Sequence, residues 1–127
     1  MASDGIPFEY VAVHPRGAGT FARVLGYYAR ERGALTLMEA LAKMTILPAK
    51  RLEDAALAMR RRGRVQVGAD ADLAVFDPEI IIDESTYDSP DTPSKGMQYV
   101  LVGGSFVVRD GRIVEGVFPG KAIGSLR

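Results

Sequence analysis

The sequence contains no cysteine, and His14 is the one histidine among its 127 residues. The lack of cysteine excludes disulfide frameworks, thiolate zinc sites and cysteine nucleophiles. A single histidine excludes, within this chain, a three-histidine metal site and an HExxH zinc helix. Long apolar runs are also missing, since none approaches the roughly 18 residues that a bilayer span requires, and the N-terminus does not resemble a signal peptide. We therefore expect a cytoplasmic protein without a membrane partner.

The composition is that of a soluble globular protein of about one domain. Apolar residues make up 47% of the chain and charged residues 25%, with 16 Lys/Arg balancing 16 Asp/Glu. The charge is unevenly spread, since residues 1–64 carry 11 Lys/Arg and 6 Asp/Glu whereas residues 65–127 carry 5 and 10. The sign changes beside the basic cluster at 60–64, where we expect a boundary between two structural layers. The cluster lacks an aromatic residue for base stacking, so we expect a solvated linker or a contact with another surface of the same parent molecule, and no nucleic-acid partner.

Helical patterns dominate the first half of the chain. Thr20 is a candidate N-cap for a helix whose apolar positions recur at i, i+3, i+4 and i+7, and Gly33 can end that helix in the left-handed conformation. Thr36 and Glu39 have the spacing of a capping box, which predicts the start of a second helix. A short third helix is expected at 49–59.

Strand patterns dominate the second half. Short β-branched runs predict strands at 72–77, 99–102, 106–109 and 113–114. The turn at 103–105 is expected to join the second strand to the third, and Asp110-Gly111 supplies the positive φ angles of a type I′ hairpin turn. Residues 83–96 are rich in Asp, Ser, Thr and Pro and are expected to form a surface loop. An antiparallel meander follows from this order.

Two motif-like stretches have simpler structural interpretations. Residues 17–22 fit the pattern G-x-G-x-x-A, but a dinucleotide fingerprint must follow a buried strand directly, and a parallel strand must follow its helix. Here a second helical pattern follows instead. Asp70 and Asp72 alternate as in a calcium loop, but the turn glycine and the final bidentate Glu are lacking. We expect a turn in which Asp72 accepts hydrogen bonds from local backbone amides.

A series of short segments nevertheless follows in a recognisable order. They are Ser3-Asp4-Gly5, 14–26 starting with His14-Pro15-Arg16, 43–45, 47–49, 63–77, 87–90, Gly96, 100–104, 107–111 and 119–121. Together they resemble the C-terminal portion of D-aminoacylases, the N-acyl-D-amino-acid deacylases of the amidohydrolase superfamily. The G-x-x-x-x-G-A-D-A-D-L stretch starting at Gly63 is common to many amidohydrolases. Ser-Asp-Gly together with His-Pro-Arg points to the deacylase branch.

The resemblance implies an α+β fragment. Full-length members are (β/α)₈ barrels that carry a composite β-sandwich domain built from both chain ends. Residues 1–62 would then be the end of strand 8 and the final helices of the metal-dependent hydrolase barrel. Residues 63–127 would be the C-terminal part of the β-sandwich. Both domains would be incomplete.

The resemblance also implies a reaction and roles for three residues. Complete members hydrolyse the linear amide C–N bond of N-acyl-D-amino acids with a zinc-activated water. Asp4 would be the catalytic acid/base at the end of strand 8, and His14 and Arg16 would bind substrate or shape a loop near the barrel mouth. The family's metal ligands come from earlier strands. We therefore expect that the isolated chain binds no metal and is inactive.

Two alternatives stay open at the level of the sequence. One is a stand-alone helix-plus-β module that binds a partner or complements a separately encoded barrel. The other is a segment of a dihydroorotase-like cyclic amidase, because such enzymes share the β-domain motif. In each case an unpaired strand edge and apolar helix faces are expected to drive self-association or binding of the missing barrel portion.

Overall fold

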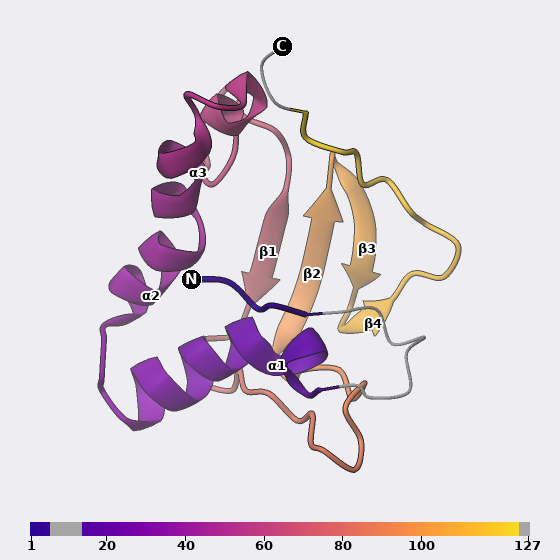
Figure 1. Ribbon diagram of the computed structural model, residues 1–127. Helices are drawn as coiled ribbons and strands as arrows, with labels where there is room; N and C mark the ends of the chain where they lie inside the picture. The colour runs from indigo at the N-terminus through magenta and orange to yellow at the C-terminus, as the bar shows by residue number, and fades with distance from the viewer. Residues whose placement is uncertain (6–13, 125–127) are drawn as a thin grey trace. The chain divides into compact units, whose positions relative to one another are not determined.

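The computed structural model describes residues 1–5 and 14–124 (Figure 1). Helices precede strands along the chain, so the predicted α+β class is confirmed. The chain forms two compact units, each assembled from two distant stretches: Met1–Ala40 with Phe76–Met97, and Leu41–Val75 with Gln98–Arg127. Within the described ranges, no helix has the length and apolar character of a membrane span.

The first helix begins earlier than the sequence pattern predicts. It starts as α1 (Arg16–Arg23) and continues as the π-helical segment η1 (Val24–Glu31). Pro15 precedes α1 with helical angles (φ −52°, ψ −23°), and the fixed φ of proline suits a helix start. Thr20 therefore lies inside the helix, where its hydroxyl donates to the carbonyl of Arg16 at 2.9 Å. The prediction of Thr20 as an N-cap is wrong.

The predicted end of this helix and the start of the next are confirmed. Gly33 has a φ of +58°, the left-handed conformation of a helix terminator. Glu39 accepts from the backbone N–H of Thr36 at 2.7 Å, and the Thr36 hydroxyl accepts from the N–H of Glu39 at 3.2 Å. This reciprocal pair is a capping box, and it opens helix α2 (Leu37–Met44).

The segment after β1 packs closely against η1 in the first unit. A Cβ on Gly26 would lie 2.3 Å from the carbonyl oxygen of Ile81 and 2.6 Å from the Ile82 side chain, so only glycine allows this approach. Ile81 is fully buried. Arg30 donates to the carbonyl oxygens of Ile81 at 2.7 Å and Pro78 at 3.1 Å, which satisfies two backbone acceptors in the contact.

The third helix is shorter than predicted. Helix α3 (Ile46–Leu52) ends well before residue 59, and after a residue with extended backbone (φ −145°, ψ 103°) a 3₁₀ turn, η2 (Leu57–Arg61), follows. The prediction of one helix over 49–59 is wrong because tertiary contact overrides local propensity. Gly63, at φ +67°, returns so close to α3 that a Cβ there would lie 2.5 Å from the carbonyl oxygen of Thr45.

The sheet has four strands in sequential order. They are β1 (Leu73–Phe76), β2 (Met97–Val102), β3 (Ser105–Arg109) and β4 (Arg112–Ile113). Strand β3 is antiparallel to both β2 and β4, and Figure 1 shows β1 and β2 running in opposite directions. The predicted meander is confirmed. Ser105, predicted within a turn, is instead the first residue of β3, because its partner Val102 extends the ladder to that point.

The hairpin between β3 and β4 has the predicted turn. Asp110 and Gly111 have φ angles of +51° and +75°, as a type I′ turn requires. The Tyr99 hydroxyl donates to the Asp110 carboxylate at 2.8 Å. This hydrogen bond to a negative charge raises the pKa of Tyr99 above 10.0, because loss of the phenolic proton would break the bond and place two negative charges together.

The basic cluster and the alternating acids bind each other in the second unit. Asp70 lies 3.2 Å from Arg61 and 3.4 Å from Arg62, and Asp72 also pairs with Arg62. Asp72 accepts from the distant backbone N–H of Gly103 at 2.7 Å. The expectation of local amide bonds to Asp72 is therefore wrong. Of the two expectations for the basic cluster, these ion pairs agree with a contact to another part of the same molecule and not with a solvated linker. The carboxylates connect the segment before β1 to the β2–β3 turn.

Candidate functional site

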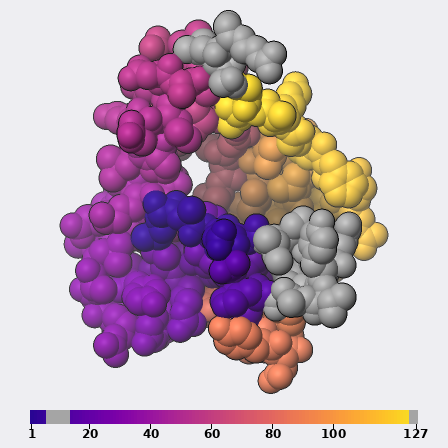
Figure 2. All heavy atoms as spheres, in the orientation of Figure 1, coloured from indigo at the N-terminus to yellow at the C-terminus, as the bar shows by residue number. Residues whose placement is uncertain are grey.

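The N-terminal segment contacts the beginning of helix α1, so Asp4 and Arg16 meet. A Cβ on Gly5 would lie 3.2 Å from the Cα of Gly17, and Figure 2 shows the first residues, in indigo, against the start of the helix, in violet. An Arg16 Nη1–Asp4 Oδ2 distance of 3.1 Å defines an ion pair. The Asp4 side chain is 82% exposed and that of Arg16 is 39% exposed, so the carboxylate is open to a reactant. Such an exposed pair contributes at most about 1 kcal/mol to folding.

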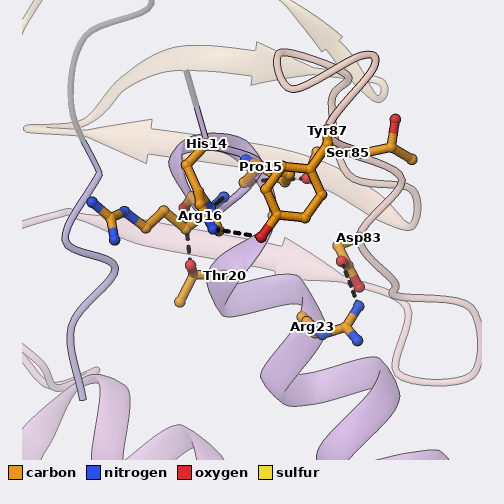
Figure 3. Close-up of a pocket in the computed structure, with 10 residues that line it drawn as sticks. His14, Pro15, Arg16, Thr20, Arg23, Asp83, Ser85 and Tyr87 are labelled. Carbon is orange, nitrogen blue, oxygen red and sulfur yellow. Dashed lines mark hydrogen bonds and ion pairs between the residues drawn. The ribbon is translucent and has the colours of Figure 1, made fainter. Parts of the chain in front are cut away.

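His14 bridges Arg16 to a residue that the sequence analysis did not single out. Its Nδ1 accepts the backbone N–H of Arg16 at 3.1 Å, and its Nε2 lies 3.0 Å from the hydroxyl of Tyr87. The two rings meet edge to face, with centroids 5.0 Å apart and an interplanar angle of 75°. His14 therefore connects the backbone at the start of α1 to the loop after β1, as Figure 3 shows.

The loop at 83–87 packs on helix α1 through two further contacts. The buried Ser85 donates from its hydroxyl to the carbonyl of Pro15 at 3.0 Å. Arg23 donates to Asp83 at 3.1 Å, and this hydrogen bond raises the pKa of Arg23 above its ordinary value. Sequence reasoning assigned this loop to the surface. The only sequence signal from this loop was segment 87–90 in the family resemblance, which gave Tyr87 no role. The close packing requires a glycine in the helix, since a Cβ on Gly19 would lie 2.4 Å from the Ser85 hydroxyl.

These contacts enclose a pocket of about 460 Å³ in the first unit (Figure 3). It is lined by His14, Pro15, Arg16, Gly19, Thr20, Arg23, Asp83, Ser85, Thr86 and Tyr87. Two of the three predicted site residues, His14 and Arg16, line it, and Asp4 reaches it through its ion pair with Arg16. The pocket combines guanidinium, imidazole, phenol and hydroxyl groups, which suits a small polar ligand with oxygen acceptors.

The described part of the chain does not contain the ligands of a metal centre. Among residues 1–5 and 14–124, no three His, Cys, Asp or Glu side chains lie close enough to share a metal ion. The described donor groups therefore do not fit a complete metal site, because protein sites for zinc typically take three or four such ligands.

Comparison with known proteins identifies the family. The sequence pattern of the amidohydrolase family matches residues 1–108. The chain therefore belongs to the amidohydrolase family.

Its relatives are deacylases of N-acyl amino acids. The chain is 44% identical over 122 residues to N-acyl-D-glutamate deacylase of Alcaligenes xylosoxydans xylosoxydans. This alignment covers 91% of this chain and 24% of the relative. A crystal structure of D-aminoacylase superposes with a TM-score of 0.85 at 39% identity, over 97% of this chain and 24% of that one. The N-acyl-D-glutamate deacylase of Bordetella bronchiseptica, solved with zinc and a phosphonate mimic of the tetrahedral intermediate, gives a TM-score of 0.74 at 42% identity, over 88% and 24%. The chain thus spans about a quarter of the length of these proteins.

Proposed function

We propose that this chain is the segment of a metal-dependent N-acyl-D-amino-acid deacylase that supplies its proton-transfer carboxylate, Asp4. The observation that carries the proposal is the ion pair between Asp4 and Arg16. It joins the Ser-Asp-Gly and His-Pro-Arg segments in a chain 44% identical to a deacylase. The deacylase names of the relatives favour a linear amide substrate over a cyclic one.

Asp4 has the chemistry that amide hydrolysis needs at one position. Its carboxylate is exposed and can accept a proton from an attacking water and return it to the departing amine nitrogen. The amide bond breaks as the nitrogen gains this proton, and the products are a carboxylate and a free amino acid. A zinc ion would supply Lewis-acid activation of the water, as in metal hydrolases generally. We propose that its ligands lie in the part of the complete enzyme that this chain does not span.

Arg16 is proposed to bind the substrate carboxylate. A guanidinium presents several N–H donors in a plane and matches a carboxylate in a two-bond geometry. Asp4 engages Nη1, and the buried Nε of Arg16 has no hydrogen-bond partner among the described residues. Arg16 therefore keeps unused donors beside the proposed acid/base. His14 would shape the loop by holding the Arg16 backbone.

The domain assignment follows from the same proposal. Residues 1–62 would belong to the end of the hydrolase barrel and residues 63–127 to its β-sandwich domain. Large apolar side chains such as Met38, 71% exposed, and Val67, fully exposed, would be covered by the rest of the polypeptide. In the isolated chain they would favour self-association.

The proposal is tested by transplanting the chain. A chimera in which it replaces the matching segment of the Alcaligenes N-acyl-D-glutamate deacylase is expected to hydrolyse N-acyl-D-amino acids, measured by release of the free amino acid. The 127-residue chain alone, with added zinc, is expected to show no turnover, because the described residues hold no metal site. A folded but inactive chimera would contradict the proposal. Turnover by the isolated chain that Asp4→Asn removes would contradict its assignment as a segment.

The role of Arg16 is tested in the same chimera with Arg16→Lys. We expect KM to rise at least about tenfold while kcat changes little, because lysine keeps the charge but not the planar pair of donors. Steady-state kinetics measure both constants. Arg60→Lys is the matched control, since Arg60 also forms an exposed ion pair, 3.8 Å from Asp54. An unchanged KM with lowered stability would assign Arg16 to loop shaping instead.

A further inference from the structure

The hydrogen bonds through His14 run in one direction. The backbone N–H of Arg16 can only donate, so His14 Nδ1 must accept and carries no proton. A neutral imidazole then carries its proton on Nε2, which donates to the Tyr87 oxygen 3.0 Å away. The chain of hydrogen bonds therefore ends on Tyr87, and the phenolic O–H is left as its terminal donor.

Two other side-chain hydroxyls that line the pocket already donate to backbone carbonyls, and the Thr86 hydroxyl accepts from the backbone N–H of Ser89 at 3.0 Å. Ser85 donates to the carbonyl of Pro15, and Thr20 donates to the carbonyl of Arg16. Arg23 is engaged by Asp83 and stacks over the Tyr27 ring at 4.7 Å. For the Tyr87 hydroxyl, the described residues provide the His14 contact and no second partner. The Tyr87 hydroxyl, unlike those of Ser85 and Thr20, therefore keeps its proton available for a ligand.

We propose that Tyr87 is a ligand-binding residue whose hydroxyl, oriented by His14, donates a hydrogen bond to a carboxylate or carbonyl oxygen of the N-acyl amino acid. This inference rests on the proposed function for the identity of the ligand. Figure 3 shows the Tyr87 hydroxyl meeting the His14 ring on the side away from the Arg16 guanidinium. Tyr87 would thus contact a different part of the ligand from Arg16. A phenol that accepts one hydrogen bond donates the next more strongly, which favours this direction.

The donor–acceptor direction of the hydrogen bonds from Arg16 through His14 to Tyr87 is tested first. The test is NMR of the 127-residue protein with ¹⁵N-labelled histidine. Because His14 is the one histidine, the imidazole signals need no assignment. We expect an unprotonated Nδ1 and a proton on Nε2 that exchanges slowly with water. In Tyr87→Phe the Nε2 proton should exchange faster, whereas in Tyr99→Phe, which removes a phenol–carboxylate bond elsewhere, it should not change. A proton on Nδ1, or an Nε2 proton that exchanges equally fast in Tyr87→Phe, would overturn the proposal.

Ligand binding is tested with N-acetyl-D-alanine and with its uncharged amide, N-acetyl-D-alaninamide, titrated into the same labelled chain. Tyr87→Phe is expected to weaken binding about tenfold, the size expected for one hydrogen bond to a charged or strongly polar acceptor, while Tyr99→Phe leaves Kd unchanged. Loss of affinity for the acid alone assigns the contact to the carboxylate, and loss for both assigns it to the acyl carbonyl. Equal Kd values for the wild type and Tyr87→Phe, or no saturable shift in the wild type, would overturn the proposal. Tyr87 is 76% exposed, so its substitution is not expected to unfold the chain.

This result is independent of turnover. Tyr87-dependent binding with an inactive chimera would contradict the proposed deacylase function and leave the ligand contact standing. An active chimera in which binding does not depend on Tyr87 would support the deacylase function and contradict the proposed Tyr87 contact. In an active chimera, Tyr87→Phe should raise KM with little change in kcat, a split that a loss of folded protein would not produce.

Discussion

Replacing Asp4 with asparagine in the chimera is expected to lower kcat/KM by about 10²–10⁴-fold, the usual contribution of a general acid or base. Asparagine has nearly the shape of aspartate, and its amide oxygen can still accept from Arg16. It cannot take up a proton from water at neutral pH. The substitution therefore removes proton transfer while the contact at the start of α1 is kept.

The matched control for this change is Asp54→Asn. Asp54 is also an exposed aspartate, 96% accessible, in an ion pair with an arginine 3.8 Å away. The loss of its charge is expected to leave kcat/KM within about twofold of the value for the unsubstituted chimera, because surface ion pairs contribute little to stability. Hydrolysis of an N-acyl-D-amino acid measured under identical conditions compares the two variants. Equal losses in both, or full activity in Asp4→Asn, would remove Asp4 from the chemistry.

Gly26→Ala is expected to destabilise the chain by about 3 kcal/mol, at the upper end of the usual cost of overpacking. The added methyl group would lie 2.3 Å from the carbonyl oxygen of Ile81, a backbone atom that cannot rotate away. Relief would require the loop after β1 to leave the helix, and with it the contacts of Asp83, Ser85 and Tyr87. Alanine's higher helix propensity, about 1 kcal/mol, is too small to compensate.

Gly120→Ala is the control for Gly26→Ala. A Cβ at Gly120 meets nothing within 4 Å, so the substitution is expected to change stability by less than about 0.5 kcal/mol. Urea unfolding of the two variants and the wild type measures the difference. If Gly26→Ala were as stable as the wild type, the close approach of Ile81 to the helix would not exist in solution.

Local features of the fold were predictable because the residues that form them are neighbours in sequence. Thr36 and Glu39 satisfy each other's backbone amides across one helical turn, and Asp110-Gly111 adopts the left-handed angles that its residue types tolerate. Each needs no partner from elsewhere in the chain. The family resemblance could also be recognised from the sequence, because it rests on short segments of neighbouring residues in a fixed order.

The Thr20 N-cap failed for a local reason, because the helix already begins after Pro15, but two other misassigned features depend on contacts between distant residues. Asp72 was expected to bond nearby amides, but it meets the N–H of Gly103 and the guanidinium of Arg62. The third helix ends at Leu52, and the chain returns at Gly63 to lie against Thr45, a contact between residues 18 positions apart. No periodicity in the sequence encodes such pairings, because they depend on which surfaces pack together.

The sequence by itself determined the α+β class, the Thr36–Glu39 capping box, the Asp110-Gly111 turn, the resemblance to a hydrolase family and the candidate residues Asp4, His14 and Arg16. Only the tertiary structure decided that Tyr87, 73 residues from His14, completes the pocket wall. The physical reason is that a hydrogen bond is satisfied by proximity in space, and the direction of its donors can be worked out only once both partners are in place.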